Sequence, residues 1–210
     1  MTYWIARTIL WFVGWQVVGE RPAAKKCVIL AAPHTSNWDV PIMLSVVRLL
    51  DMRVRWTMKH TWFFWPLTIL WNRVGALSID RRGQHDVVQQ MIDAFAAHDE
   101  LMLIITPEGT RSRAEFWKSG FYHVARGANV PVVLGICDYG KRRGGIGPTV
   151  NLTGDVRRDM DVLRAHFAGQ QGKHPDCFGP VRLKAEDEPD TPIEGAPSET
   201  QPTGTSEASQ

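Results

Sequence analysis

The sequence predicts an α/β domain with a largely parallel central sheet flanked by helices. Short apolar runs of strand length alternate with segments of helical period from about residue 25 to residue 167. Strands that alternate with helices form a parallel sheet covered on both faces. Polar and basic residues follow several of these runs directly, where functional loops of such a sheet lie. The length of 210 residues suits one domain with short appendages.

The individual elements follow from local pattern. Apolar or alternating runs predict strands at residues 27–32, 53–58, 75–79, 101–105 and 130–136, with a last one at 149–152. Helical periodicity predicts helices at 41–50, 84–97, 116–126 and 156–167. The segment Gly140–Pro148 is rich in glycine and basic residues, so we expect a turn there.

The first part of the chain is expected to be a membrane-associating hydrophobic helix, residues 1–24. Residues 3–18 are almost wholly apolar, with Arg7 as their one charge. Sixteen residues fall short of the roughly 20 that span a bilayer, which favours a helix embedded in the interface or dipping into one leaflet. The alternative is a helix buried on the domain. The domain itself is expected at 25–182, and a disordered acidic tail at 183–210.

Charge and tryptophan are unevenly distributed. Residues 185–210 carry seven acidic residues and no basic one, so the chain's +2 becomes +9 for the remainder. A basic globular part predicts an anionic partner, either a phospholipid surface, a phosphorylated substrate or nucleic acid. Eight of nine tryptophans lie within the first 71 residues, which favours a membrane interface. The aromatic run from Trp62 to Trp71 is interpreted as part of that surface, with core packing as the alternative.

The three cysteines are far apart and form no CxxC pair. This argues against a disulfide framework and a zinc site, and it fits a reducing compartment.

The first candidate for chemistry is the pair His34 and Asp39, which follows the strand predicted at 27–32. A histidine can accept the proton of an attacking hydroxyl, and a carboxylate on its other nitrogen fixes the tautomer. Five positions are too many for one helical face, but a turn entering a helix could bring the side chains together. The alternative is that Asp39 or Asn37 only caps the helix near Pro41.

Three further polar segments follow predicted strands. Residues 106–113 (TPEGTRSR) combine a glycine, hydroxyls and two arginines, which is typical of an anion pocket or of a solvated loop. Residues 75–82 end in Arg81 and Arg82, and Lys59 and His60 follow the strand at 53–58. Because parallel strands end at one edge of the sheet, we expect the base and these cations to converge there.

At these residues the sequence resembles the 1-acylglycerol-3-phosphate (lysophosphatidic acid) acyltransferase family, within the glycerolipid acyltransferases. Four blocks match in order over roughly residues 25–155. They are the HX4D block at 34–39, the block from Gly75 to Arg81, the PEGTRS block at 107–112, and the apolar block with a central proline at 130–133. Thr106 departs from the family, in which many members carry Phe at this position.

The resemblance implies an O-acyltransferase in phospholipid biosynthesis. His34, held by Asp39, would act as base on the acceptor hydroxyl, which attacks the thioester of acyl-CoA or acyl-carrier protein. Arg81, Glu108 and Arg111 would orient the acceptor phosphate, with Gly109 and Thr110 in the same pocket and Lys59 near the reacting groups. The implied product is phosphatidic acid, and neither a metal nor a bound redox cofactor is expected.

The expected partners are a membrane surface, the lysophospholipid acceptor and the acyl donor, with acyl-carrier protein as one candidate donor, and no nucleic acid. The expected location is the cytoplasmic face of the cell membrane, as a peripheral or monotopic protein. Glycerol 3-phosphate or a lyso-ornithine lipid could replace the acceptor, and a non-catalytic lipid-binding protein is the rival from another class. A serine hydrolase is disfavoured because no G-x-S-x-G is present.

Overall fold

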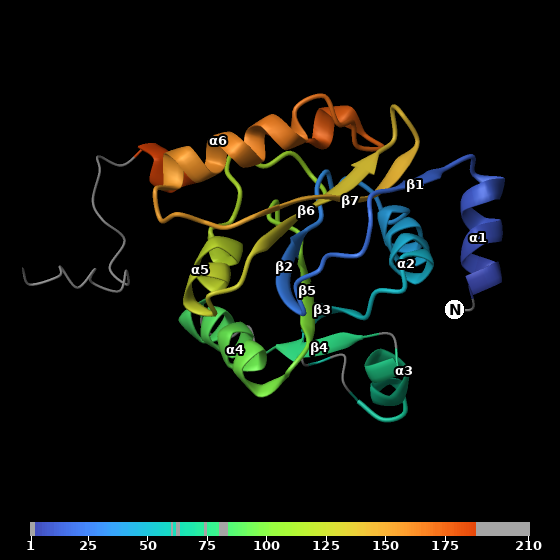
Figure 1. Cartoon of the computed structure of the whole chain (residues 1–210), viewed down its shortest axis with the longest axis horizontal. Helices are drawn as coiled ribbons and strands as arrows, with labels where there is room; N and C mark the ends of the chain where they lie inside the picture. The colour runs from blue at the N-terminus through green and yellow to red at the C-terminus, as the bar shows by residue number, and fades with distance from the viewer. Residues whose placement is uncertain (1–2, 60, 62–63, 74, 80–83, 188–210) are drawn as a thin grey trace, which may run out of the picture.

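A computed structural model describes residues 3–59, 61, 64–73, 75–79 and 84–187 of the chain (Figure 1). Within these residues a seven-stranded sheet has the order β1-β7-β6-β2-β5-β3-β4. All neighbouring strands are parallel except β6 and β7. The strands are β1 (Gln16–Val18), β2 (Lys26–Leu30), β3 (Val54–Lys59), β4 (Ala76–Ile79), β5 (Leu101–Ile105), β6 (Val132–Asp138) and β7 (Arg143–Val150). The predicted largely parallel sheet is confirmed.

Helices cover both faces of this sheet. Val28 and Leu30 of β2 face one side, where they pack in a core with α4, α5 and α6. Cys27 and Ile29 alternate to the other side, where α2 covers them and α1 packs outside α2 (Figure 1). Burial on both faces explains why β2 and β5 read as unbroken apolar runs. The helices are α1 (Tyr3–Phe12), α2 (Asp39–Leu49), α3 (Leu67–Arg73), α4 (Gln84–Ala97), α5 (Gly120–Gly127) and α6 (Val156–Phe167).

The N-terminal helix is shorter than predicted. It ends at Phe12, and Gly14 adopts a positive φ of 69°, which a helix interior does not allow. Residues 16–18, expected to be helical, instead form β1 and pair with residues 143–145 of β7. No helix among the described residues is long and apolar enough to cross a membrane.

One face of α1 is buried against the domain and the other is exposed. Ala6 and Leu10 are buried, and Leu10 belongs to an apolar cluster with Ile42 and Val46 of α2. The opposite face presents three large side chains to solvent: Trp4 is 71% exposed, Trp11 78% and Phe12 83%. The alternative of a helix buried on the domain thus holds for one face, and membrane association of the exposed face stays a prediction.

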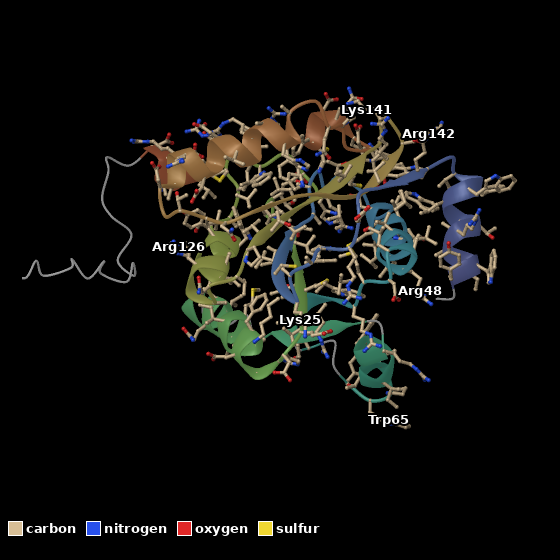
Figure 2. All side chains as sticks on the ribbon, in the orientation of Figure 1. Lys25, Arg48, Trp65, Arg126, Lys141 and Arg142 are labelled. Atoms are coloured by element: carbon tan, nitrogen blue, oxygen red, sulfur yellow. The ribbon has the colours of Figure 1, made fainter. Side chains whose placement is uncertain are left out.

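The expected turn at 140–148 is wrong for most of its length. Only residues 140–142 turn, and residues from Arg143 onward form β7, antiparallel to β6. The glycines allow close packing here, because a Cβ on Gly145 would lie 1.9 Å from the carbonyl oxygen of Val18. Lys141 and Arg142 remain exposed at the hairpin tip beside β1 (Figure 2).

The start of one helix and the start of the C-terminal tail also differ from the prediction. The helix expected at 116–126 begins at Gly120, because Trp117 makes a β-bridge with Leu183. Leu183 is buried, and Glu186 accepts a hydrogen bond from Arg164 at 2.8 Å. Residues 183–187, expected to be disordered, therefore pack on the domain; the expected tail from residue 188 lies outside the described residues.

Candidate active site

His34 and Asp39 meet at the carboxyl edge of the sheet. His34 lies in the loop after β2, and Asp39 is the first residue of α2. The two atoms His34 Nδ1 and Asp39 Oδ2 are 3.1 Å apart, and the His34 side chain is 22% exposed. The predicted pairing of these side chains is confirmed. With Nδ1 turned to the carboxylate, Nε2 is the nitrogen that can take a proton from a substrate.

Asp39 is buried and its two oxygens are fully engaged. Oδ2 accepts the backbone N–H groups of Thr35 and Ser36 at 2.9 and 3.0 Å, and Oδ1 accepts the Tyr139 hydroxyl at 2.7 Å. Burial alone would raise the pKa of Asp39, but these hydrogen bonds, with that of His34, outweigh it and lower the pKa. Because the carboxylate turns back to the loop before α2, the capping interpretation of Asp39 is wrong.

Glu108 lies under the histidine loop, and its role in orienting an acceptor phosphate stays a prediction. It follows β5, is 2% exposed, and its Oε1 accepts the backbone N–H of His34 at 2.7 Å. Its other oxygen, Oε2, is buried and has no hydrogen-bond partner among the residues that the structure describes. Burial raises the pKa of Glu108 to about 7, so at neutral pH a proton on Oε2 offsets the cost of that position. The contacts of Glu108 hold the histidine backbone in place.

The titration of Glu108 predicts a stability that falls as pH rises. Between pH 4.5 and 7 the unfolded chain loses this proton while the folded chain keeps it, so the free energy of unfolding decreases by up to about 3 kcal/mol. Glu108→Gln removes this dependence. Urea denaturation at pH 4.5, 6 and 8 measures it, with Glu115→Gln, an exposed position in the same loop, as control. Equal pH slopes in the wild type and Glu108→Gln would contradict the assignment.

The loop after Glu108 brings a lysine to the site that the sequence motifs did not predict. Gly109 has φ +66°, and a Cβ at this position would lie 2.5 to 2.9 Å from the side chain of Lys118, including Nζ. The backbone N–H of Lys118 donates to Pro107 at 2.8 Å, which closes the loop. Lys118 therefore lies across the glycine, and within the described part of the chain its Nζ has no carboxylate partner. No local sequence pattern predicts that the Lys118 side chain packs over the backbone of Gly109, nine positions earlier in the chain.

The structure describes only part of the other predicted phosphate-binding residues. Thr110 and Arg111 are exposed in the loop after β5, and the Thr110 hydroxyl accepts the N–H of Ser112 at 3.2 Å. Arg113 donates to the carbonyl of Phe178 at 3.0 Å, so it ties the loop to the C-terminal segment. Lys59 is the last residue of β3, at the same edge, and Arg81 lies outside the described residues. Their convergence on His34 stays a prediction.

A C-terminal segment packs directly on the histidine loop. The backbone N–H of His174 donates to the Thr35 hydroxyl at 3.2 Å, and Lys173 Nζ lies 5.0 Å from the centre of the Trp38 ring. Gly172 touches Thr35, since a Cβ there would lie 2.6 Å from its hydroxyl oxygen. The neighbours of His34 thus come from segments far apart in sequence.

A cavity of about 1150 Å³ opens at this edge. Its polar lining includes His34, Asp39 and Lys118. Its apolar lining includes Met43, Trp56, Val88, Ile104 and Phe121. It is somewhat larger than the roughly 300–1,000 Å³ of common small-molecule sites. The site therefore combines a few polar side chains with a mostly apolar lining, which suits an amphiphilic ligand.

Fold and site together define an α/β protein with a histidine–aspartate pair at the carboxyl edge of its sheet. The chain belongs to the Acyltransferase family, whose sequence profile matches residues 15–134. This confirms the family resemblance found in the four sequence blocks. Its fold is similar to that of the 1-acyl-sn-glycerophosphate (LPA) acyltransferase PlsC from Thermotoga maritima, with a TM-score of 0.53, 14% identity, and coverage of 81% of this chain and 80% of the other. A search of curated protein sequences found no significant match.

Proposed function

We propose that this acyltransferase moves a fatty acyl group from acyl-CoA or acyl-carrier protein to the free hydroxyl of 1-acylglycerol 3-phosphate, giving phosphatidic acid. The observation that carries this proposal is the His34–Asp39 pair, 3.1 Å apart, in the lining of a largely apolar cavity. His34 Nε2 takes the proton of the acceptor hydroxyl as its oxygen attacks the thioester carbon. The carbon–sulfur bond then breaks, and the thiol leaves with the proton returned by the imidazolium. These steps use the chain's own residues, with no resident metal or redox cofactor.

The acceptor phosphate would be bound by cations at the polar end of the cavity. Lys118 lies across Gly109 and lines the cavity, and Arg111 is exposed in the same loop. The apolar lining would take an acyl chain. The likeness to the PlsC structure supports the fold of such an enzyme, and the acceptor assignment rests on the sequence blocks and this distribution of charge.

An acyl-transfer assay with the purified full chain in detergent tests the proposed function. Lysophosphatidic acid, glycerol 3-phosphate and a lyso-ornithine lipid are offered in parallel, each with labelled acyl-CoA and acyl-carrier protein. We expect phosphatidic acid from lysophosphatidic acid at the highest kcat/KM. A higher kcat/KM with one of the other two acceptors would identify that acceptor as the substrate in place of lysophosphatidic acid. Absence of transfer to all three acceptors would reject the proposal.

Replacing Lys118 by methionine is expected to weaken acceptor binding. A charged hydrogen bond to phosphate contributes about 1.5–3 kcal/mol, so KM for lysophosphatidic acid should rise roughly 10- to 100-fold. Steady-state kinetics measures this, and Lys25→Met is the matched control because Lys25 is exposed at the amino end of β2. An unchanged KM in Lys118→Met would remove the lysine from the phosphate site.

We also propose that the protein works at a membrane surface, on the cytoplasmic face of the cell membrane. Exposed aromatic side chains on α1 support this, as do Phe64 (53% exposed) and Trp65 (82% exposed) before α3. Trp65 projects from the rim of the domain in Figure 2. Trp62, in the same aromatic run, lies outside the described residues. The sequence near α1 and near the segment before α3 also contains basic residues, which can bind anionic lipid headgroups.

Substituting the exposed tryptophans tests this membrane role. Trp11→Ser combined with Trp65→Ser is expected to reduce binding to sedimented anionic vesicles at least about tenfold, because each indole contributes a large apolar area at the interface. Trp117→Phe, a substitution at a buried indole, serves as control. Equal binding of the double variant and the wild type would reject the role.

A further inference from the structure

We propose that Tyr139 is a positioning residue for the His34–Asp39 pair, and that Trp15 holds Tyr139 in place. This inference rests on the proposed function in that it assigns the pair to catalysis. It goes further by making the junction of the N-terminal helix and the sheet a part of the catalytic machinery. Trp15 lies outside the four sequence blocks, and Tyr139 lies six positions after the last block and beyond residues 15–134 that match the family profile.

The hydroxyl of Tyr139 completes the hydrogen bonding of Asp39. It donates to Oδ1 at 2.7 Å, while Oδ2 faces His34 and accepts two backbone N–H groups. With donors on both oxygens the carboxylate cannot rotate about its axis without losing hydrogen bonds. The orientation of the carboxylate sets the direction in which it holds the imidazole, so Tyr139 acts on His34 through Asp39.

Tyr139 is itself held by the N-terminal part of the chain. Its ring meets the Trp15 ring edge to face, with centroids 4.8 Å apart, and it packs against the apolar cluster between α1 and α2. The N–H of Trp15 donates to the carbonyl of Leu10 in α1 at 2.8 Å. On the other side, the N–H of Tyr139 donates to Gln171 at 2.8 Å. The tyrosine is therefore clamped from α1, from the cluster with α2, and from the segment after α6.

Loss of the phenol predicts a specific electrostatic effect. Each donor disperses the negative charge of Asp39, so removal of one leaves more charge facing His34 and stabilises the imidazolium. The base then requires a higher pH to become neutral. Among the described residues, the titratable groups that face Asp39 or His34 from the packed elements are Glu108, Cys137 and Tyr139. Of these three, Tyr139 is the one that donates to the carboxylate.

Tyr139→Phe tests the inference in the full chain. We expect the apparent pKa of His34, measured by NMR of the labelled imidazole, to rise by about half a unit or more. The acid limb of the kcat–pH profile should shift in the same direction, and kcat below neutral pH should fall roughly threefold or more with KM for lysophosphatidic acid unchanged. Trp15→Leu should produce a smaller shift of the same sign, and Trp15→Phe, which retains an aromatic edge, should restore the wild-type profile.

Two controls separate this role from general destabilisation. Tyr122→Phe removes another tyrosine–aspartate hydrogen bond of 2.7 Å, to the buried Asp159, and should lower stability without moving the His34 titration. Thr8→Ala changes an exposed position of α1 and should leave the pH profile unchanged. An unaltered His34 titration in Tyr139→Phe overturns the inference, whatever its melting temperature. If Tyr139→Phe does not fold, an unshifted profile in Trp15→Leu overturns it.

Failure of the proposed function would give a different result. The NMR titration of His34 reports on the tyrosine without any assay of acyl transfer. A shifted titration in a protein that transfers no acyl group would retain the positioning role of Tyr139 and reject the reaction. If Tyr139→Phe titrates like the wild type and the wild-type protein transfers acyl groups, the reaction is retained and the positioning role of Tyr139 is rejected.

Discussion

His34→Ala is expected to lower kcat for acyl transfer by roughly 10²–10⁴-fold, the usual contribution of a positioned general base. The imidazole has its Nδ1 on Asp39 and lines the cavity, so its loss leaves the acceptor hydroxyl without a proton acceptor. KM for the acceptor should change little, because the proposed phosphate site lies on another loop. Asp39→Asn should also be severely impaired, since the amide cannot hold the imidazole in the same tautomer.

The matched control for this substitution is His98→Ala. His98 follows α4 immediately before β5, so it lies at the amino edge of the sheet, opposite the site. Steady-state kinetics with lysophosphatidic acid and labelled acyl donor measures both variants. Full transfer activity in His34→Ala would defeat the catalytic assignment, whereas a loss in both variants would point to damage of the fold.

Gly145→Ala is expected to destabilise the protein by about 1–3 kcal/mol or more, the range of overpacking in a close-packed interior. The added Cβ would lie 1.9 Å from the Val18 carbonyl oxygen, and backbone cannot move aside as a flexible side chain can. We expect β1 to detach from β7, which exposes the chain between α1 and β2. Urea denaturation measures the stability, and limited proteolysis after residue 12 reports the detachment.

Gly120→Ala provides the comparison for this effect. A Cβ at Gly120 would meet no atom within 4 Å, so its stability should stay within about 0.5 kcal/mol of the wild type. Equal stabilities of Gly145→Ala and Gly120→Ala would show that β1 is not packed against β7 as described.

The predicted elements that the structure reproduces are those whose burial is set by local pattern. The helix at 84–97 and the strand at 101–105 have the predicted bounds, because an amphipathic period and a fully buried run leave little choice. Residues 16–18 and 143–148 were missed because they become strands only through pairing with distant chain. Propensity at glycine-rich positions such as Gly144 and Gly145 opposes that outcome, and tertiary contacts override it.

The candidate site divides in the same way. His34 and Asp39 are close in sequence, so a turn suffices to join them, and the chemistry of the two residue types is sufficient to predict the pair. Tyr139 and Lys118 reach the site through the sheet order and a backbone crossing at Gly109, which no local pattern encodes. The burial of Glu108 could not be predicted either, since a glutamate in a polar loop is usually solvated.

The pairing of Gln16 with Arg143 has a consequence for biosynthesis. Within the described sheet, the strand at 16–18 gains its neighbour only after about 125 further residues, up to Arg143, have been translated. At about 5–20 residues per second this interval is roughly 6–25 s. Throughout it Trp15, which directly precedes this strand, lacks the Tyr139 ring against which it packs in the folded chain.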